Sequence, residues 1–333
     1  MAPLTGEAGC EHERSDDDRE DRDGERAGGA HTAASVRAGS PQTAVSSSFV
    51  IRVDAATVLL QWAAGGLLFL WFTTRRRLVG IGYGWLLRGT YLLIAAGAFA
   101  CGLAFGVQPV REAASVCVVV ASLVALVVSI VRRGAGVSGQ HDEHDRRTER
   151  VAAMTGIERD VPQRISGGLE FPPVLDLVAP LFGFVGLVAA GVGAGGNDVV
   201  AVVRTVVGAA FLGAITDAML LGHWYLVQPG LPRGLLNELV SATKYVLPVE
   251  VAVMLLPTGM LSVLSGRISD GWNGTLGYFW IACAVTTGVL CVVTQRALRE
   301  KYYSAVMAAT GLLYLAILTA FGTDLVARAV LAG

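Results

Sequence analysis

Among the polar side chains that interrupt the apolar stretch from Gly213 to Pro257, six are candidates for binding a substrate or a proton. They are Asp217, His223, Tyr225, Glu238, Lys244 and Glu250. A charged side chain at the centre of a bilayer is unfavourable by roughly 2.5–3.5 kcal/mol on insertion scales. Their retention therefore predicts a polar site, at which a substrate or a proton binds, between two membrane-spanning helices.

The short turn from Gln228 to Arg233 predicts that the helices before and after it are antiparallel neighbours. Counting outward from the turn, Asp217 lies level with Lys244, and His223 lies level with Glu238. We therefore expect two acid–base combinations at matched depths. Residues six apart differ by about 120° around a helix axis, so only one of Asp217 and His223 faces the next helix directly.

Pro248 stands inside the second helix of this pair, two residues before Glu250. Proline removes a backbone hydrogen bond, so we expect a kink beside Glu250 and backbone carbonyls that are available to a ligand or an ion. Broken helices near the bilayer midplane are typical of the binding sites of carriers.

Each of these features also has a structural interpretation. A pair between Lys244 and Asp217 can be an internal ion pair with no part in transport. Trp224 and Tyr225 near the inner membrane surface are typical of interfacial anchors. A single histidine such as His223 is usually satisfied by a neighbour.

Three functional hypotheses follow. The first, which we prefer, is a proton-coupled carrier of small molecules, with Asp217, Lys244 and Glu250 as its binding cluster. The second is a membrane subunit of an electron-transfer complex, in which Asp217, His223 and Tyr225 bind a quinone head group and partner subunits supply the redox centres. The third is a structural membrane protein with internal ion pairs.

The sequence contains no motif of a soluble enzyme, such as a Walker loop, an H-E-x-x-H helix or a C-x-x-C pair. The five cysteines have no metal-ligand spacing. Apart from the quinone of the second hypothesis we identify no cofactor, and we expect no nucleic-acid partner.

The composition indicates an integral membrane protein whose main partner is the lipid bilayer. Of the 333 residues, 53% are hydrophobic and only 16% are charged, with a mean hydropathy of +0.56. A soluble domain carries about a quarter of charged residues. The predominance of arginine over lysine is typical of a GC-rich bacterium, so we expect the bacterial cytoplasmic (inner) membrane.

Eight hydrophobic runs are close to the length of about 20 residues that crosses a bilayer as a helix. They are Ala55–Thr73, Gly89–Val107, Ala113–Val131, Val174–Val192, Val199–Val227, Leu235–Leu256, Gly274–Val293 and Ser304–Phe321. We therefore expect an all-α fold, a polytopic transmembrane bundle of about eight spanning helices. Residues 49–133 form a three-helix transmembrane segment, and residues 172–333 form a five-helix segment that contains the polar hairpin.

The remaining segments are polar. Residues 1–48 mix acidic, basic and small side chains with almost no large apolar residue, so we expect a disordered tail. Residues 134–171 are expected to be a cytoplasmic polar loop. Arginine and lysine concentrate in alternate loops, and short loops with positive charge stay in the cytoplasm. This pattern predicts that both termini lie outside.

Overall fold

A computed structural model describes residues 54–139, 142, 145–146, 149, 169–228, 231–256 and 259–332. These residues belong to one compact unit, Val45–Gly333, and the elements that they form are helices. The all-α prediction is confirmed. The predicted tail 1–48 and most of the predicted loop 134–171 lie outside the described residues, so both stay predictions.

Eight helices of 18 residues or more are present in the described part of the chain. They are α1 (Ala55–Thr74), α2 (Ile81–Phe105), α3 (Pro109–Val131), α5 (Leu175–Val192), α6 (Asp198–Val227), α7 (Arg233–Leu255), α9 (Thr275–Arg299) and α10 (Tyr303–Ala332). A 3-10 turn, η2 (Arg132–Ala135), follows α3, and the five-residue helix α8 (Met260–Leu264) precedes α9.

Seven of the long helices are long and apolar enough to cross a membrane, which makes the chain a multi-pass membrane protein. The exception among the described helices is α7, which corresponds to the expected sixth span. Every 18-residue stretch of α7 contains Glu238, Lys244 and Glu250. It packs between α6 and α9 within the bundle.

Side-chain caps fix where several helices begin. Asp54 accepts a hydrogen bond from the Thr57 backbone N–H at 2.8 Å and starts α1. Asn197 caps α6 in the same way. The Asp270 carboxylate accepts N–H bonds in the turn before α9, the shortest at 2.8 Å from Gly274, and these bonds hold the pKa of Asp270 below its usual value.

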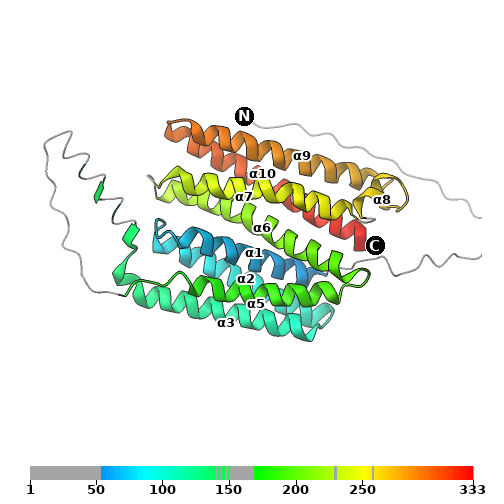
Figure 1. Ribbon diagram of the computed structural model, residues 1–333, viewed down its shortest axis with the longest axis horizontal. Coiled ribbons are helices and arrows are strands. Elements are labelled where there is room, and N and C mark those ends of the chain that lie inside the picture. Colours follow the sequence, from blue (N-terminus) through cyan, green and yellow to red (C-terminus); the bar gives the residue numbers. More distant parts are fainter. Residues whose placement is uncertain are drawn as a thin grey trace, which may run out of the picture. The chain divides into compact units, whose positions relative to one another are not determined.

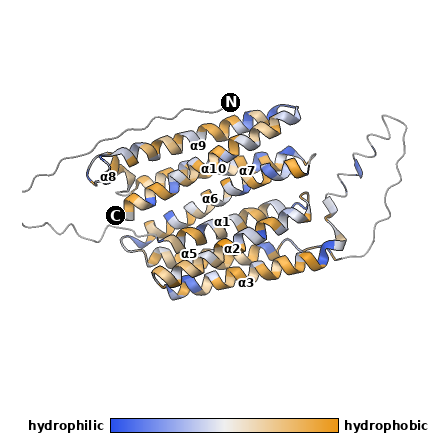
Figure 2. Ribbon diagram, turned by 180° about the vertical axis from the view of Figure 1, so that it is seen from behind, coloured by the Kyte–Doolittle hydropathy of each residue, from blue (hydrophilic) through white to orange (hydrophobic). Residues whose placement is uncertain are grey.

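The helices form two groups that meet along α6 (Figure 1). The first group contains α1, α2, α3 and α5, and the second contains α6, α7, α9 and α10. Both α1 and α5 pack against α6, and α1 and α6 are the most buried of the spanning helices. Apolar residues predominate along the helices (Figure 2), as expected for helices that cross a membrane.

Glycines allow α1 and α6 to touch through their backbones. A Cβ atom added to Gly65 would overlap the carbonyl oxygen of Ala209, and one added to Gly213 would overlap the backbone of Gly65. Small residues at such contacts are the usual means by which membrane helices approach closely. The α1–α6 contact therefore depends on the absence of side chains at these positions.

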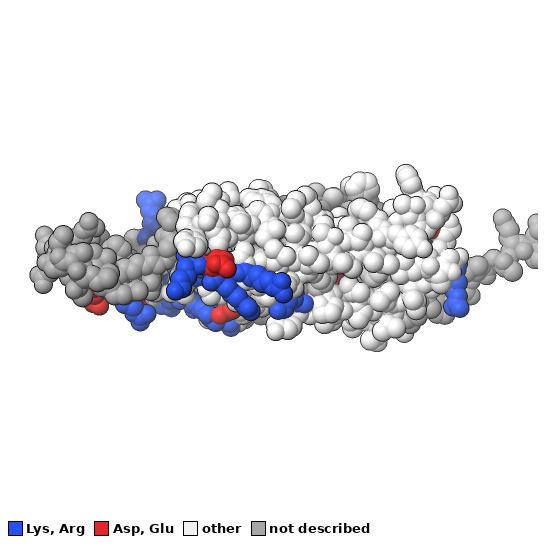
Figure 3. All heavy atoms as spheres, turned by 90° about the horizontal axis from the view of Figure 1, so that it is seen from above, with Lys and Arg blue, Asp and Glu red and all other residues white. Residues whose placement is uncertain are grey.

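Basic residues gather at one end of the bundle, which we call the arginine-rich end (Figure 3). Its members follow α1, α3 and α6 or lie around the end of α9, and they are Arg75, Arg76, Arg77, Arg132, Arg133, Arg233, Arg296, Arg299 and Lys301. The opposite end contains Arg111 and Arg267. The direction in which this end faces stays a prediction.

Candidate functional site

Asp217 and Lys244 have different partners. The buried Asp217 carboxylate accepts a hydrogen bond from the Tyr91 hydroxyl of α2. The Lys244 Nζ atom donates to Gln295 Oε1 of α9 at 2.8 Å. The predicted pair between Asp217 and Lys244 is therefore wrong. Matched depth in an antiparallel hairpin does not fix the direction in which each side chain points around its helix.

The second predicted combination, His223 with Glu238, is also wrong. His223 is exposed, and its Nδ1 atom lies 3.1 Å from the Tyr314 hydroxyl of α10. Glu238 forms an ion pair of 2.8 Å with Arg76 at the arginine-rich end.

Tyr225 is buried, and its hydroxyl donates to the Pro232 carbonyl at 2.5 Å, which closes the turn between α6 and α7. Asp217, His223 and Tyr225, the residues of the quinone hypothesis, thus have separate hydrogen-bond partners. The interfacial-anchor interpretation does not fit Tyr225 either, because its side chain faces protein.

Tyr91 and Gly66 define the surroundings of Asp217. A Cβ atom at Gly66 would overlap the Tyr91 ring, so this glycine leaves the space in which the tyrosine reaches α6. The second carboxylate oxygen of Asp217 has no hydrogen-bond partner among the described residues.

Glu250 meets three charged residues that the sequence did not connect with it. Arg204 comes from α6, and Asp324 and Arg328 come from α10; all four side chains are buried. We call Arg204, Glu250, Asp324 and Arg328 the four-charge cluster. It contains two acids and two bases, so its formal charge is balanced when all four are ionised.

Asp324 and Arg328 form the best-satisfied pair of the cluster. The Arg328 Nε atom lies 2.9 Å from both Asp324 carboxylate oxygens, and Nη2 lies 2.8 Å from Oδ1. The Arg328 Nη2 atom also donates to the Arg204 carbonyl at 3.1 Å. A Cβ atom at Gly208 would overlap this guanidinium, so Gly208 provides its space. The pair is fixed on α10 and tied to α6.

Arg204 connects α6 to the end of α7. Its Nε atom donates to the Val253 carbonyl at 2.9 Å, and its Nη2 atom donates to the Leu256 carbonyl at 2.5 Å. The last carbonyls of a helix have no partner within the helix, and a cation is favourable there. Gly259 lies so close that an added Cβ would be 2.5 Å from Arg204 Nη2. Arg204 therefore caps α7 from a neighbouring helix.

Glu250 differs from its neighbours because no N–H or O–H group of the described residues donates a hydrogen bond to its carboxylate. Its side chain is 0% exposed, and the Asp324 carboxylate beside it can share a hydrogen bond with Glu250 only when one of the two is protonated. The charges that act on it are those of Asp324, Arg328 and Arg204. Burial and Asp324 oppose its ionised form, and the two guanidinium groups favour it. When such a carboxyl takes up or releases a proton, the net charge of the cluster, whose members lie on α6, α7 and α10, changes by one.

Pro248 lies two residues before Glu250, and α7 continues as a helix through it. Because proline has no N–H, the Lys244 carbonyl lacks its usual donor within the helix. The predicted kink stays a prediction.

The structure corrects the end of the eighth span. This span was expected to end at Phe321, but α10 continues to Ala332 and buries Asp324 and Arg328. Arg204, inside the expected fifth span, caps α7 from α6. The spacing of four between Asp324 and Arg328, with apolar residues continuing to Leu331, was the sequence signal that could have shown a buried pair.

Comparisons of the chain with protein-family models, curated proteins and solved structures found no match. Within the described residues, no group of three or more His, Cys, Asp or Glu side chains is placed to hold a metal ion.

Proposed function

We propose that this multi-pass membrane protein is a proton-coupled carrier in which Glu250 binds and releases the coupling proton. The observation that supports this most strongly is the contrast within the four-charge cluster. The Asp324 and Arg328 side chains satisfy each other, as structural ion pairs do. Glu250 is equally buried, and among the described residues no N–H or O–H group donates to either of its carboxylate oxygens. Unsatisfied buried acids in membrane helices are unfavourable and are retained mainly for function.

The cluster also offers a way to couple a proton to movement. Protonation of Glu250 changes the formal charge of the cluster from zero to +1. This change removes the electrostatic attraction of Arg204 and Arg328 for the Glu250 carboxylate of α7. The hydrogen bonds of the two arginines to backbone carbonyls and to Asp324 remain. Because Arg204 holds the end of α7, the relative energies of two arrangements of α6, α7 and α10 then depend on the proton. Glu250 thus takes the place of the predicted cluster of Asp217, Lys244 and Glu250.

Infrared difference spectroscopy of the purified protein in lipid tests the proton site without knowledge of the substrate. We expect a pH-dependent C=O stretching band of a protonated carboxyl that disappears in Glu250→Gln. Glu238→Gln is the matched control, because Glu238 lies on the same helix, is partly exposed and pairs with Arg76. The band should persist in this control. A spectrum that is unchanged in Glu250→Gln would contradict the proposal and favour a structural role for the cluster.

We also propose that the protein lies in a bacterial cytoplasmic membrane with the arginine-rich end toward the cytoplasm. The support is the distribution of the basic residues that flank the long helices, nine at the arginine-rich end against Arg111 and Arg267 at the other. Positively charged short loops are retained on the cytoplasmic side.

A further inference from the structure

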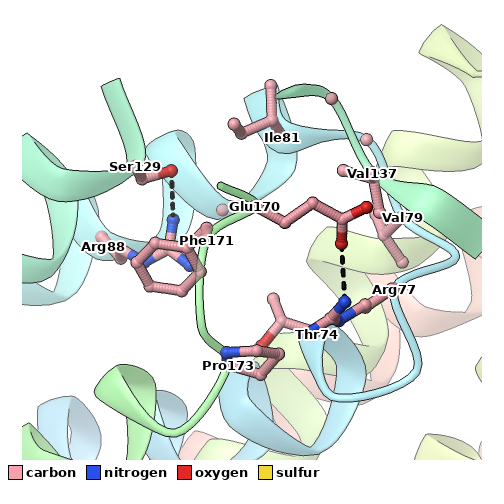
Figure 4. A pocket seen from close by; sticks show the side chains of 13 residues that line it. Thr74, Arg77, Val79, Ile81, Arg88, Ser129, Val137, Glu170, Phe171 and Pro173 are labelled. Atoms are coloured by element: carbon pink, nitrogen blue, oxygen red, sulfur yellow. Dashed lines mark hydrogen bonds and ion pairs between the residues drawn. The ribbon is translucent and has the colours of Figure 1, made fainter. Parts of the chain in front are cut away.

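A separate pocket lies at the arginine-rich end, away from the four-charge cluster. The space between its lining atoms is about 420 Å³, a volume that includes open solvent. Its walls come from α1, α2, α3 and the residues that lead into α5. Figure 4 shows its labelled side chains, with Arg88 on one side and Arg77 and Glu170 on the other.

A buried ion pair forms one wall of this pocket. Arg88 Nε and Nη2 each lie 2.7 Å from a carboxylate oxygen of Asp176, and both side chains are buried. Thr74 donates to Asp176 at 2.8 Å, and Arg88 donates to Ser129 at 3.1 Å. The Phe171 ring covers the guanidinium, with its centroid 4.2 Å from Cζ. Since Asp176 neutralises Arg88, this wall has little net charge.

The opposite wall contains a second, looser ion pair. Arg77 Nη1 lies 2.7 Å from Glu170 Oε2, and the Ser138 hydroxyl donates to the same oxygen at 3.2 Å. The Arg77 and Glu170 side chains are 43% and 24% exposed. Half-exposed ion pairs contribute little free energy, so another anion can replace Glu170 at small cost.

The backbone of Arg77 indicates that its position is constrained. Its φ angle is 53°, in the left-handed region that non-glycine residues seldom adopt. Such conformations are concentrated at sites where the surrounding structure imposes them, often for ligand binding. Of the described residues that line the pocket, Glu170 is the only one with a carboxylate.

From these contacts we infer that the pocket binds a small amphiphilic anion, whose carboxylate or phosphate group replaces the Glu170 carboxylate on Arg77. The planar guanidinium fork matches both kinds of anion. The other lining residues include Val79, Ile81, Val137 and Pro173, which suit an apolar portion of the ligand. Glu170 then acts as an internal competitor. The ligand is either a soluble metabolite or the headgroup of an anionic lipid, since both present this chemistry.

Calorimetric titration of the purified full chain in uncharged detergent tests this inference, with hexyl phosphate as the probe. Arg77→Gln should weaken binding by about tenfold, the factor expected for the loss of one charge-assisted hydrogen bond. Glu170→Gln should strengthen binding, because it removes the competitor. The matched control is Arg76→Gln, which removes the same charge from the neighbouring residue that pairs with Glu238 outside the pocket.

Equal weakening by Arg77→Gln and Arg76→Gln would overturn the inference, because it would indicate general attraction to the positive end. Unchanged or weaker binding in Glu170→Gln would overturn it as well. The affinity for short-chain phosphatidylglycerol, compared with the affinity for hexyl phosphate, distinguishes the source of the ligand. Tighter binding of the lipid than of hexyl phosphate indicates a lipid site, and the reverse order indicates a metabolite site. Glu250→Gln should bind hexyl phosphate as the wild type does, so this test is independent of the proton site.

Discussion

The four-charge cluster shows how the role of a buried charged residue depends on its partners. Asp324 and Arg328 satisfy each other, Arg204 satisfies carbonyls at the end of α7, and no N–H or O–H group of the described residues donates to Glu250. Removal of one member of a satisfied pair leaves a buried charge uncompensated, whereas removal of both leaves none. The satisfied pair should therefore behave differently from Glu250 in mutants.

Arg328→Met is expected to destabilise the protein by about 3–5 kcal/mol, because it leaves Asp324 buried without its partner. The double substitution Asp324→Asn with Arg328→Met should recover a substantial part of this loss. Unfolding in mixed micelles with increasing denaturant measures both. A double mutant no more stable than Arg328→Met would show that the two residues are not a coupled pair.

Pairing between residues could not be predicted from the α6–α7 hairpin alone. The hairpin itself was expected, and both helices are present, but the partners of their polar residues come from α2, α9 and α10. Asp217 reaches Tyr91 and Lys244 reaches Gln295, across 126 and 51 positions of sequence. The direction of a side chain around its helix is decided by which other helices pack there, and the spacing within one hairpin contains no information about them.

The contact between α1 and α6 gives a prediction for helix packing. Gly213→Ala should destabilise the protein by about 1–3 kcal/mol, the usual effect of overpacking, because its Cβ would overlap the Gly65 backbone. Gly89→Ala is the matched control, since the same atom added in α2 meets nothing within 4 Å. Helix propensity predicts that the control is unchanged or more stable by up to about 1 kcal/mol. Melting temperatures that fall equally in both variants would argue against a specific α1–α6 contact.

For the whole molecule, hydropathy predicted a multi-pass helical bundle but misplaced helix ends where charges are buried. The second span was expected to begin at Gly89, and α2 begins at Ile81 and includes Arg88. The eighth was expected to end before Asp324, which α10 buries. A hydropathy scale gives every charged residue the same unfavourable value, whether or not a partner neutralises its charge. Arg88 and Asp324 are neutralised by Asp176 and Arg328, so they lie within the bundle.

The uneven distribution of basic residues predicts the orientation of the whole bundle. In bacterial host cells, with the five native cysteines replaced, we expect a membrane-impermeant maleimide to label Ser269→Cys in intact cells. Ser269 is exposed in the connection between α8 and α9, at the end with few arginines.

Tyr302→Cys is the counterpart of Ser269→Cys at the other end. Tyr302 is exposed between α9 and α10, beside Arg299 and Lys301, and its carbonyl accepts a hydrogen bond from Arg233. It should be labelled only after the cells are permeabilised, because moving this positive end across the membrane is unfavourable. The reverse labelling pattern would place the pocket of Arg77 and Glu170 outside the cell. Labelling of both positions in intact cells would indicate two orientations in the same membrane. A balanced distribution of charge between the two ends would produce that result, and this chain has an unbalanced one.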